Sequence, residues 1–243
     1  MSASGKLVAE ILLEIRNRIK PGVTTQELDQ LAARLSFKKK ARPAFKGYNG
    51  YPFSLCVSVN EEVVHGFPSR RRLRDGDIVS LDFGVYFEGY YGDAALTQAV
   101  GKVSPLAEKL IRVTREALFK GLEQVRAGSR LGDVSFAVQQ YVEGHGFSVV
   151  RQFVGHGIGK ALHEDPQIPN FGEAGWGILL KPGMVLAIEP MVNAGGSDVE
   201  ILADGWTAVS KDRSLSAHFE HTIAITENGC RILTQADHCA TLF

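Results

Sequence analysis

The first forty residues alternate between apolar and polar positions in the way that amphipathic helices do. The first apolar stripe consists of Leu7, Ile11, Ile15 and Ile19. This spacing places the four side chains on one helical face, and Pro21-Gly22 would end that helix. Thr24 and Glu27 have the spacing of a capping box, which predicts a second helix to about Leu35.

Later segments favour further helices and then strands. Ser104-Pro105 would start a helix to about Arg126, and another is predicted over about 131–144. Runs rich in β-branched residues and bounded by turn signals predict strands. These strands are expected over 53–65, 77–86, 91–100, 184–192, 199–209 and 217–226, with 77–86 and 91–100 forming a hairpin.

Two pairs of segments repeat at nearly the same offset. Leu73–Asp82 aligns with Leu180–Glu189 at an offset of 107 residues, and Lys20–Glu27 aligns with Arg126–Asp133 at an offset of 106. In each copy a helix ends, a second helix begins, and a buried strand follows that ends in a carboxylate. Two matches of this kind indicate a duplicated unit.

The duplication predicts a single domain over 1–243, with halves at about 1–105 and 106–243, and an α/β (α+β) fold. A site at the junction would take side chains from both halves. The length of 243 residues and the apolar fraction of 44% suit one large globular domain.

Charge and cysteine content narrow the class of protein. Lys+Arg and Asp+Glu both number 27, so net charge gives no case for a nucleic-acid or membrane protein. No apolar run is long enough to span a bilayer, and the charged N-terminus is unlike a secretory signal. The cysteines, Cys56, Cys230 and Cys239, form no CxxC pair, which suits a reducing cytosol.

Four carboxylates lie in apolar strand segments, where lone charges are rarely buried. Asp82 and Asp93 are equidistant from the predicted turn at 87–88, so an even hairpin would place them directly opposite each other. A bridging cation would offset their repulsion and burial, whereas two solvated aspartates are the alternative. Glu189 and Glu220 favour the cation, because several carboxylates with few nitrogen ligands typify a pair of divalent metal ions.

His156 is the expected nitrogen ligand. It lies in the glycine-rich segment Phe153–Gly159, where close approach of the backbone is permitted. His65 ends an earlier strand, and His163 follows His156 by seven residues. A lone histidine is more often structural, and this is expected of His145, His218, His221 and His238.

Five segments resemble signatures of the type I methionine aminopeptidases. They are Tyr51–Gly66, Asp77–Asp93, Gly155–Phe171, Ile188–Asn193 and Asp212–Thr222. The resemblance covers about residues 6–235. It implies the pita-bread fold, in which two pseudo-symmetric halves share a curved, mostly antiparallel sheet covered by helices.

The resemblance also implies a role for each matched residue. The implied metal ligands are Asp82, Asp93, His156, Glu189 and Glu220, with Glu220 bridging two divalent ions of Co, Mn, Fe or Zn. His65 and His163 would contact substrate, and Glu189 would also be catalytic. The implied lining of the methionine pocket is Tyr48, Tyr51, Cys56, Leu162 and Trp206. A monovalent cation is implied near Asn60 and Ser216.

The implied activity is removal of the N-terminal methionine from nascent polypeptides whose second residue is small, by attack of a metal-activated water on the first peptide bond. One departure is Leu162, where the family usually has an aromatic residue, so the pocket should be wider. The zinc-binding extension of longer type I forms and the helical insert of type II forms are absent. A cytoplasmic monomer is expected.

Two rival functions remain. An Xaa-Pro aminopeptidase of the same fold would carry a separate N-terminal domain, for which few residues are available. A non-catalytic binding protein on this fold would be expected to have lost ligands. The basic runs 38–42 and 70–74 are expected to be solvated loops, with transient contact to ribosomal RNA as the functional alternative.

Overall fold

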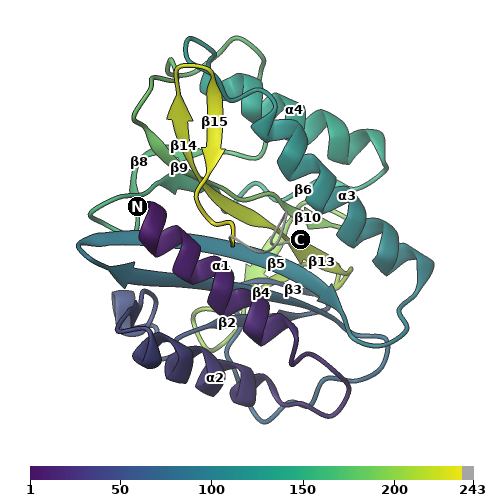
Figure 1. Cartoon of the computed structure of the whole chain (residues 1–243). Helices are drawn as coiled ribbons and strands as arrows, with labels where there is room; N and C mark the ends of the chain where they lie inside the picture. Colours follow the sequence, from purple (N-terminus) through teal and green to yellow (C-terminus); the bar gives the residue numbers. More distant parts are fainter. Residues whose placement is uncertain (237–243) are drawn as a thin grey trace.

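The computed structural model describes residues 1–236, so His238 and Cys239 lie outside the described residues. The described residues form four α-helices: α1 (Ser2–Arg16), α2 (Thr25–Lys38), α3 (Pro105–Leu122) and α4 (Leu131–Gly144) (Figure 1). The predicted capping box forms, because the Glu27 N–H donates to Thr24 Oγ1 at 3.2 Å and the Thr24 N–H donates to Glu27 Oε2 at 2.7 Å. No described helix is long and apolar enough to cross a membrane.

Nine strands form the main sheet, in the order β1-β4-β5-β14-β9-β7-β8, with β2 paired to β4 and β15 to β14. They are β1 (Arg42–Pro43), β2 (Cys56–Val59), β4 (Ile78–Phe87), β5 (Tyr90–Ala99), β7 (Gly155–Gly157), β8 (Glu164–Ile168), β9 (Val185–Ile188), β14 (Glu220–Thr226) and β15 (Gly229–Ile232). One small sheet contains β6 (Ser148–Val149), β10 (Met191–Asn193) and β13 (Ser216–His218). Another contains β3 (Glu62–Val64), β11 (Val199–Ile201) and β12 (Ala208–Ser210). The strand pairs are antiparallel, as expected.

Two segments predicted as single strands change sheets instead. The segment 184–192 divides into β9 and β10 at Glu189-Pro190, where proline has no N–H for a ladder. The segment 217–226 divides into β13 and β14 at Phe219. Because β10 and β13 pair in the small sheet, Glu189 and Glu220 lie where the chain passes between the two sheets.

The register of the β4–β5 hairpin differs from the prediction by two residues. Its turn is Glu88-Gly89, with φ of 50° and 86°, as two-residue hairpin turns of the primed types favour. Asp82 therefore pairs with Ala95, and Asp93 with Gly84, so direct opposition of the aspartates is wrong. A shift of two residues preserves the face of each side chain, and the two carboxylates stay on the same side of the sheet.

The duplicated segments adopt matching conformations. The isolated bridge between Thr24 and Arg72 recurs between Arg130 and Leu179, at offsets of 106 and 107 residues. Each half thus ties the start of its second helix to the segment before the strand that leads to a site carboxylate, β4 in the first half and β9 in the second. In the main sheet, β4-β5 of the first half meets β14-β9 of the second half at the β5–β14 pair.

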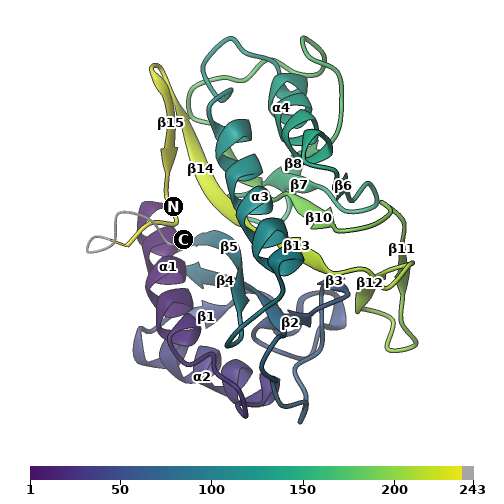
Figure 2. The same cartoon turned by 90° about the vertical axis from the view of Figure 1, so that its right-hand side faces the viewer.

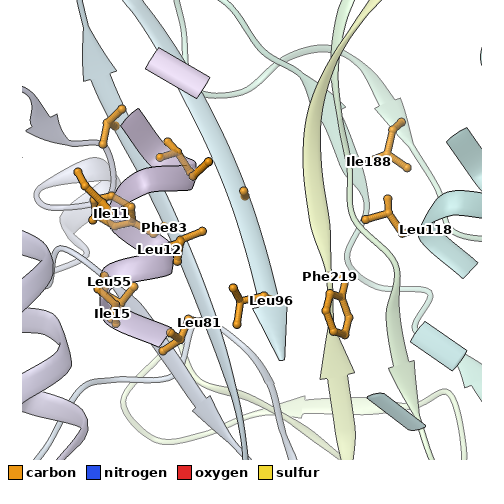
Figure 3. Packing of buried hydrophobic residues seen from close by; sticks show 14 of the residues in the cluster. Ile11, Leu12, Ile15, Leu55, Leu81, Phe83, Leu96, Leu118, Ile188 and Phe219 are labelled. Atoms are coloured by element: carbon orange, nitrogen blue, oxygen red, sulfur yellow. The ribbon is translucent and has the colours of Figure 1, made fainter. Parts of the chain in front are cut away.

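The helices cover one face of the main sheet. Ile11, Leu12 and Ile15 of α1 pack against Leu81 and Phe83 of β4 (Figure 3). Full burial of each such side chain stabilises the fold by about 1.5–3 kcal/mol. Helices α1 and α3 both lie along this face (Figure 2). Since side chains alternate along a strand, Asp82, between Leu81 and Phe83, projects from the opposite face.

Candidate metal and substrate site

One row of cross-strand partners crosses four strands on the face away from the helices. Its members are Cys56, Asp82, Ala95 and Glu220, on β2, β4, β5 and β14. Directly paired residues project from the same face of a sheet. Ala95 contributes only a methyl group, which leaves room between the carboxylates of Asp82 and Glu220. Asp93, two residues before Ala95, projects into the same space.

A second row brings the histidine to the same face. It runs through His156, Ala187 and Thr222, on β7, β9 and β14. Thr222 follows Glu220 by two residues, so both rows share one face. The close approach of β7 requires glycine, because a Cβ on Gly155 would lie 2.4 Å from the carbonyl oxygen of Ala187. The expected role of the glycines beside His156 is therefore confirmed.

The rows converge on a buried cluster with free ligand atoms. One ligand atom from each of Asp93, His156 and Glu220 lies within 4.8 Å of the others. Among residues 1–236, Asp82 Oδ1, Asp93 Oδ1 and Glu220 Oε1 are buried without a hydrogen-bond partner. Buried carboxylate oxygens are costly unless paired, and oxygen-rich donor sets suit divalent cations. These residues fit a divalent metal.

The cluster holds more carboxylates than can ionise together without a cation. Burial, followed by the neighbouring Glu189 carboxylate, raises the pKa of Asp82 to about 7, although His218 opposes this. Burial raises the pKa of Glu189 to about 8. Burial and the adjacent carboxylates hold the pKa values of Asp93 and Glu220 well above the ordinary range. Such shifts concentrate at functional sites.

His156 is prepared as a ligand through its ring tautomer. Its Nδ1 lies 2.8 Å from the carbonyl oxygen of Gly157, which can only accept, so Nδ1 carries the proton. The Nε2 lone pair is left free and lies 3.7 Å from Glu189 Oε1. Burial lowers the pKa of His156 to about 4, so the ring is neutral at pH 7. A neutral ring with a fixed Nδ1–H is the form that metals bind.

His65 and His163 lie beside the cluster as neutral rings. His163 stacks obliquely on His156 with ring centroids 4.2 Å apart, and its Nδ1 is 2.8 Å from the Tyr48 hydroxyl oxygen. Burial lowers the pKa of His163, and it lowers that of His65 to about 4. His65 packs edge-on against Phe153 with centroids 5.3 Å apart. Each ring can therefore donate one N–H into the site.

These residues line one cavity of about 220 Å³. Its walls contain every residue predicted for the site, from Tyr48 to Glu220, including the exposed His163 and the buried Leu162. They also contain Phe45 and Asn49, which sequence reasoning missed. Phe45 enters because Gly84 has no side chain: a Cβ there would lie 3.1 Å from Phe45 Cε1. In the sequence, only their closeness to Tyr48 and Tyr51, two residues predicted for the pocket, pointed to Phe45 and Asn49.

His218 contradicts the expectation that it is structural. Its Nε2 is buried, has no hydrogen-bond partner in the described part of the chain, and lies 3.6 Å from Glu189 Oε2. The expectation rested only on the general rarity of functional lone histidines, and it could not include the change of sheet at Phe219, which separates β13 from β14. His145 and His221 agree with structural roles, since their Nδ1 atoms lie 2.7 Å from Tyr141 O and 2.8 Å from Thr234 Oγ1.

A main-chain hydrogen bond joins Asn60 and Ser216. The Ser216 N–H donates to the Asn60 carbonyl oxygen at 2.8 Å. The side chain of Asn60 is engaged separately, by Asp77 Oδ1 at 2.9 Å and by the Ile78 N–H at 3.0 Å. Any cation here would therefore depend on main-chain oxygens.

Two similar halves form one curved sheet, and buried carboxylates cluster where the halves meet. One imidazole suited to bind a metal and two neutral histidines lie beside the carboxylates. This combination defines a metallohydrolase. Residues 1–227 match metallopeptidase family M24. Methionine aminopeptidase 1 of Bacillus subtilis is 56% identical over 235 residues, which cover 97% of this chain and 95% of that protein. The chain therefore belongs to metallopeptidase family M24 and, within it, to the methionine aminopeptidases.

Other relatives agree. The methionine aminopeptidase of Escherichia coli is 46% identical over 96% of this chain and 89% of its own length. The crystal structure of the Thermotoga maritima methionine aminopeptidase superposes with a TM-score of 0.95 at 53% identity, covering 96% of this chain and 94% of that chain. The prolidase of Pyrococcus horikoshii superposes with a TM-score of 0.78 at 22% identity. The superposed region covers 97% of this chain and 61% of the prolidase chain, which shows a shared fold. The pita-bread fold is confirmed.

Proposed function

We propose that the protein is a metal-dependent aminopeptidase that removes the N-terminal methionine of nascent polypeptides when the second residue is small. The observation that carries the proposal is the convergence of partnerless, buried carboxylate oxygens on a neutral histidine at the end of an apolar cavity. Relatives that are 46–56% identical and named methionine aminopeptidase support it. A single catalytic domain over 1–243 would contain the whole site.

The metal ligands would be five side chains with oxygen and imidazole donors. They are Asp82, Asp93, His156, Glu189 and Glu220, with Glu220 shared between two divalent ions. This donor set suits Co, Mn, Fe and Zn alike. When bound, the ions would supply Lewis acidity toward the scissile carbonyl and a more acidic water.

The proton would be moved by Glu189. Its side chain is only 14% exposed, and it lies between the rings of His156 and His218. A buried carboxylate at this position can take a proton from the attacking water and give it to the leaving nitrogen. Each transfer uses a side-chain oxygen of Glu189, so no other general base is needed.

The two flanking histidines would stabilise negative charge on the carbonyl oxygen. A Tyr48 hydroxyl that donates to Nδ1 of His163 leaves the ring proton on Nε2, available to substrate. His65 is neutral and offers one N–H in the same way. Donors fixed in a site before the reaction stabilise the transition state without reorganisation.

The methionine side chain would occupy the apolar part of the cavity. Tyr51 and Trp206 pack edge-to-face there, with ring centroids 5.1 Å apart. Cys56 and Leu162 complete the wall, and both are buried. A flexible thioether chain fits such an aromatic slot, because sulfur and rings attract each other.

The proposal also includes the protein's location, its oligomeric state, a monovalent cation and contact with RNA. The protein would act as a cytoplasmic monomer, with a monovalent cation near Asn60 and Ser216. Contact with ribosomal RNA through the basic runs 38–42 and 70–74 would be transient. Some basic residues of these runs make contacts within the protein instead. Lys39 forms an ion pair with Glu10 at 2.5 Å, and Arg72 donates to the Gly22 carbonyl oxygen at 2.7 Å.

Release of free methionine tests the proposal. Protein stripped of metal is assayed on the peptide Met-Ala-Ser with manganese, iron(II), cobalt or zinc added back one at a time. Turnover is expected with at least one ion, and Asp93→Asn should abolish it, whereas His145→Ala, which alters a histidine outside the cavity, should retain it. Cleavage of Ala-Pro-Ser in preference to Met-Ala-Ser would favour an Xaa-Pro aminopeptidase. No release with any ion would favour a binding protein.

A further inference from the structure

A second cavity, of about 380 Å³, adjoins the first one. The segment 42–48 separates the two. Phe45 lines the metal cavity, Arg42 and Lys46 line the second cavity, and Tyr48 belongs to the walls of both. The two spaces therefore lie on either side of this segment and share the Tyr48 side chain as a wall.

The second cavity is basic and aromatic. The guanidinium carbon of Arg42 lies 4.6 Å from the ring centroid of Tyr86, and the ring of Tyr86 lies 4.8 Å from that of Tyr91. This stacking holds the guanidinium in place, so less rotamer freedom remains to be lost when a ligand binds. Lys46 supplies a second exposed cation.

The charge in this cavity is only partly compensated, because the nearby Asp29 carboxylate interacts with Lys46 without forming a close ion pair. No carboxylate lines it, and within residues 1–236 neither Arg42 nor Lys46 has an ion-pair partner within 4.0 Å. Other basic residues of the same region are engaged, as Lys39 is with Glu10. Two exposed cations that form no close ion pair, beside a polypeptide-binding site, favour an acidic ligand.

The proposed substrate site lies next to this cavity, because Tyr48 belongs to the walls of both. Tyr48 is hydrogen-bonded to His163, which flanks the position proposed for the scissile bond. A polypeptide held there by its first residue must leave the metal cavity past its rim. Each extended residue advances the chain by about 3.3–3.6 Å, so the third to fifth residues would extend beyond the Tyr48 side chain.

We propose that the cavity lined by Arg42, Lys46, Tyr86 and Tyr91 binds acidic side chains at the third to fifth positions of the substrate polypeptide. This subsite rests on the proposed function, since it assigns the route of that substrate. It would make turnover depend on residues beyond the small second one. Because both cations are exposed, the preference should be modest and weakened by salt.

Matched peptides test the subsite. Met-Ala-Ser-Glu-Glu-Ala and Met-Ala-Ser-Lys-Lys-Ala are compared by methionine release at low ionic strength. The unaltered protein should favour the acidic peptide about threefold to tenfold in kcat/KM. The preference should shrink at 0.5 M salt. Arg42→Gln with Lys46→Gln should abolish it, and Arg42→Glu with Lys46→Glu should reverse it.

The control carries the same change of charge elsewhere. Arg70→Glu with Arg74→Glu alters two exposed arginines outside both cavities and should keep the preference for acid. Equal rates for both peptides in the unaltered protein would overturn the subsite while leaving methionine release intact. So would a loss of preference in the control, which would indicate a long-range field. Absence of release from either peptide would overturn the proposed function, and the subsite with it.

Discussion

Nε2 of His218 lies 3.6 Å from Oε2 of Glu189, while the other oxygen of that carboxylate faces His156 at 3.7 Å. Glu189 is thus flanked by an imidazole on each side. The main chain of His218 is fixed by Thr97, whose Oγ1 accepts from the His218 N–H at 2.8 Å and donates to its carbonyl oxygen at 2.9 Å. Such anchoring makes His218 a positioning residue for the proposed proton carrier.

Removing this ring should lower turnover without emptying the site. His218→Ala should reduce kcat about tenfold to a hundredfold, the usual loss when a partner of a ligand is removed, with little change in KM. His218→Gln should restore most of the activity, because its amide group places a polar N–H beside Glu189 in a side chain of similar length. Kinetics are compared with metal content by elemental analysis. An equal loss in both variants would mean that the ring only fills space.

His163→Ala should reduce kcat by roughly two to three orders of magnitude, as expected for loss of one donor to the transition state. Metal content should not change, because the exposed ring of His163 is stacked on His156 and hydrogen-bonded to Tyr48 outside the carboxylate cluster. Metal loss in this variant would instead make His163 a ligand.

Metal-free protein should lose stability as pH rises from 5 to 8. Burial holds the pKa of Asp82 at about 7 and of Glu189 at about 8, whereas both ionise near 4 in an unfolded chain. The unfolded state therefore binds fewer protons over this window, and the free energy of unfolding falls as pH rises. The Tm should drop by more than about 10 °C over this window.

The same carboxylates supply the control for that titration. Asp82→Asn combined with Glu189→Gln should flatten the fall in Tm, since neither side chain then loses a proton. Manganese added to the unaltered protein should raise Tm most at pH 8, where the carboxylates are ionised. Parallel Tm curves for the variant and the unaltered protein would contradict the assignment.

Gly84→Ala should disturb the site and the fold together. Its Cβ would lie 3.1 Å from Phe45 Cε1 and 3.2 Å from Asp93 Oδ1, tighter than ordinary contact. Overpacking of this kind costs about 1–3 kcal/mol, and the displaced Phe45 should raise KM for methionine peptides. Gly144→Ala in α4 is the control, because nothing lies within 4 Å of its Cβ. Denaturant unfolding and kinetics measure both effects.

Leu162 should leave the pocket more tolerant than an aromatic residue would. The side chain is buried in the cavity wall and smaller than a phenylalanine ring. Changes of this size in an apolar pocket are worth about 1–3 kcal/mol, so a modest shift is expected. The ratio of kcat/KM for Leu-Ala-Ser to that for Met-Ala-Ser should fall in Leu162→Phe. Equal ratios would show that position 162 does not set specificity.

Local patterns were sufficient for the existence and starts of the helices but not for all their ends, because α1 ends at Arg16, before the predicted Ile19, and α3 ends at Leu122 rather than at about Arg126. The prediction over 131–144 coincides with α4, and the Thr24 capping box starts α2 as expected. Both depend on residues within one or two turns of each other. The matched motifs likewise identified the cavity lining, apart from Phe45 and Asn49.

Strand pairing was harder to predict, because its partners are distant in sequence. The hairpin register depended on placing positive φ at Glu88 and Gly89, and an error of one turn position moved every pair by two. The exchange of sheets at Phe219 could not be read from alternation within 217–226. His218 was consequently misjudged, since its surroundings come from Thr97 and Glu189 rather than from its own strand.

The halves of the duplicated chain contribute unequally to the site. Asp82 and Asp93 come from the first half, whereas His156, Glu189 and Glu220 come from the second. A half-length ancestor could therefore have enclosed the same space only as a homodimer, with its twofold axis between the strands that became β5 and β14. Within one chain the two halves need not be identical. The second half supplies the imidazole of His156, and it has Glu189 where the first half has the shorter Asp82.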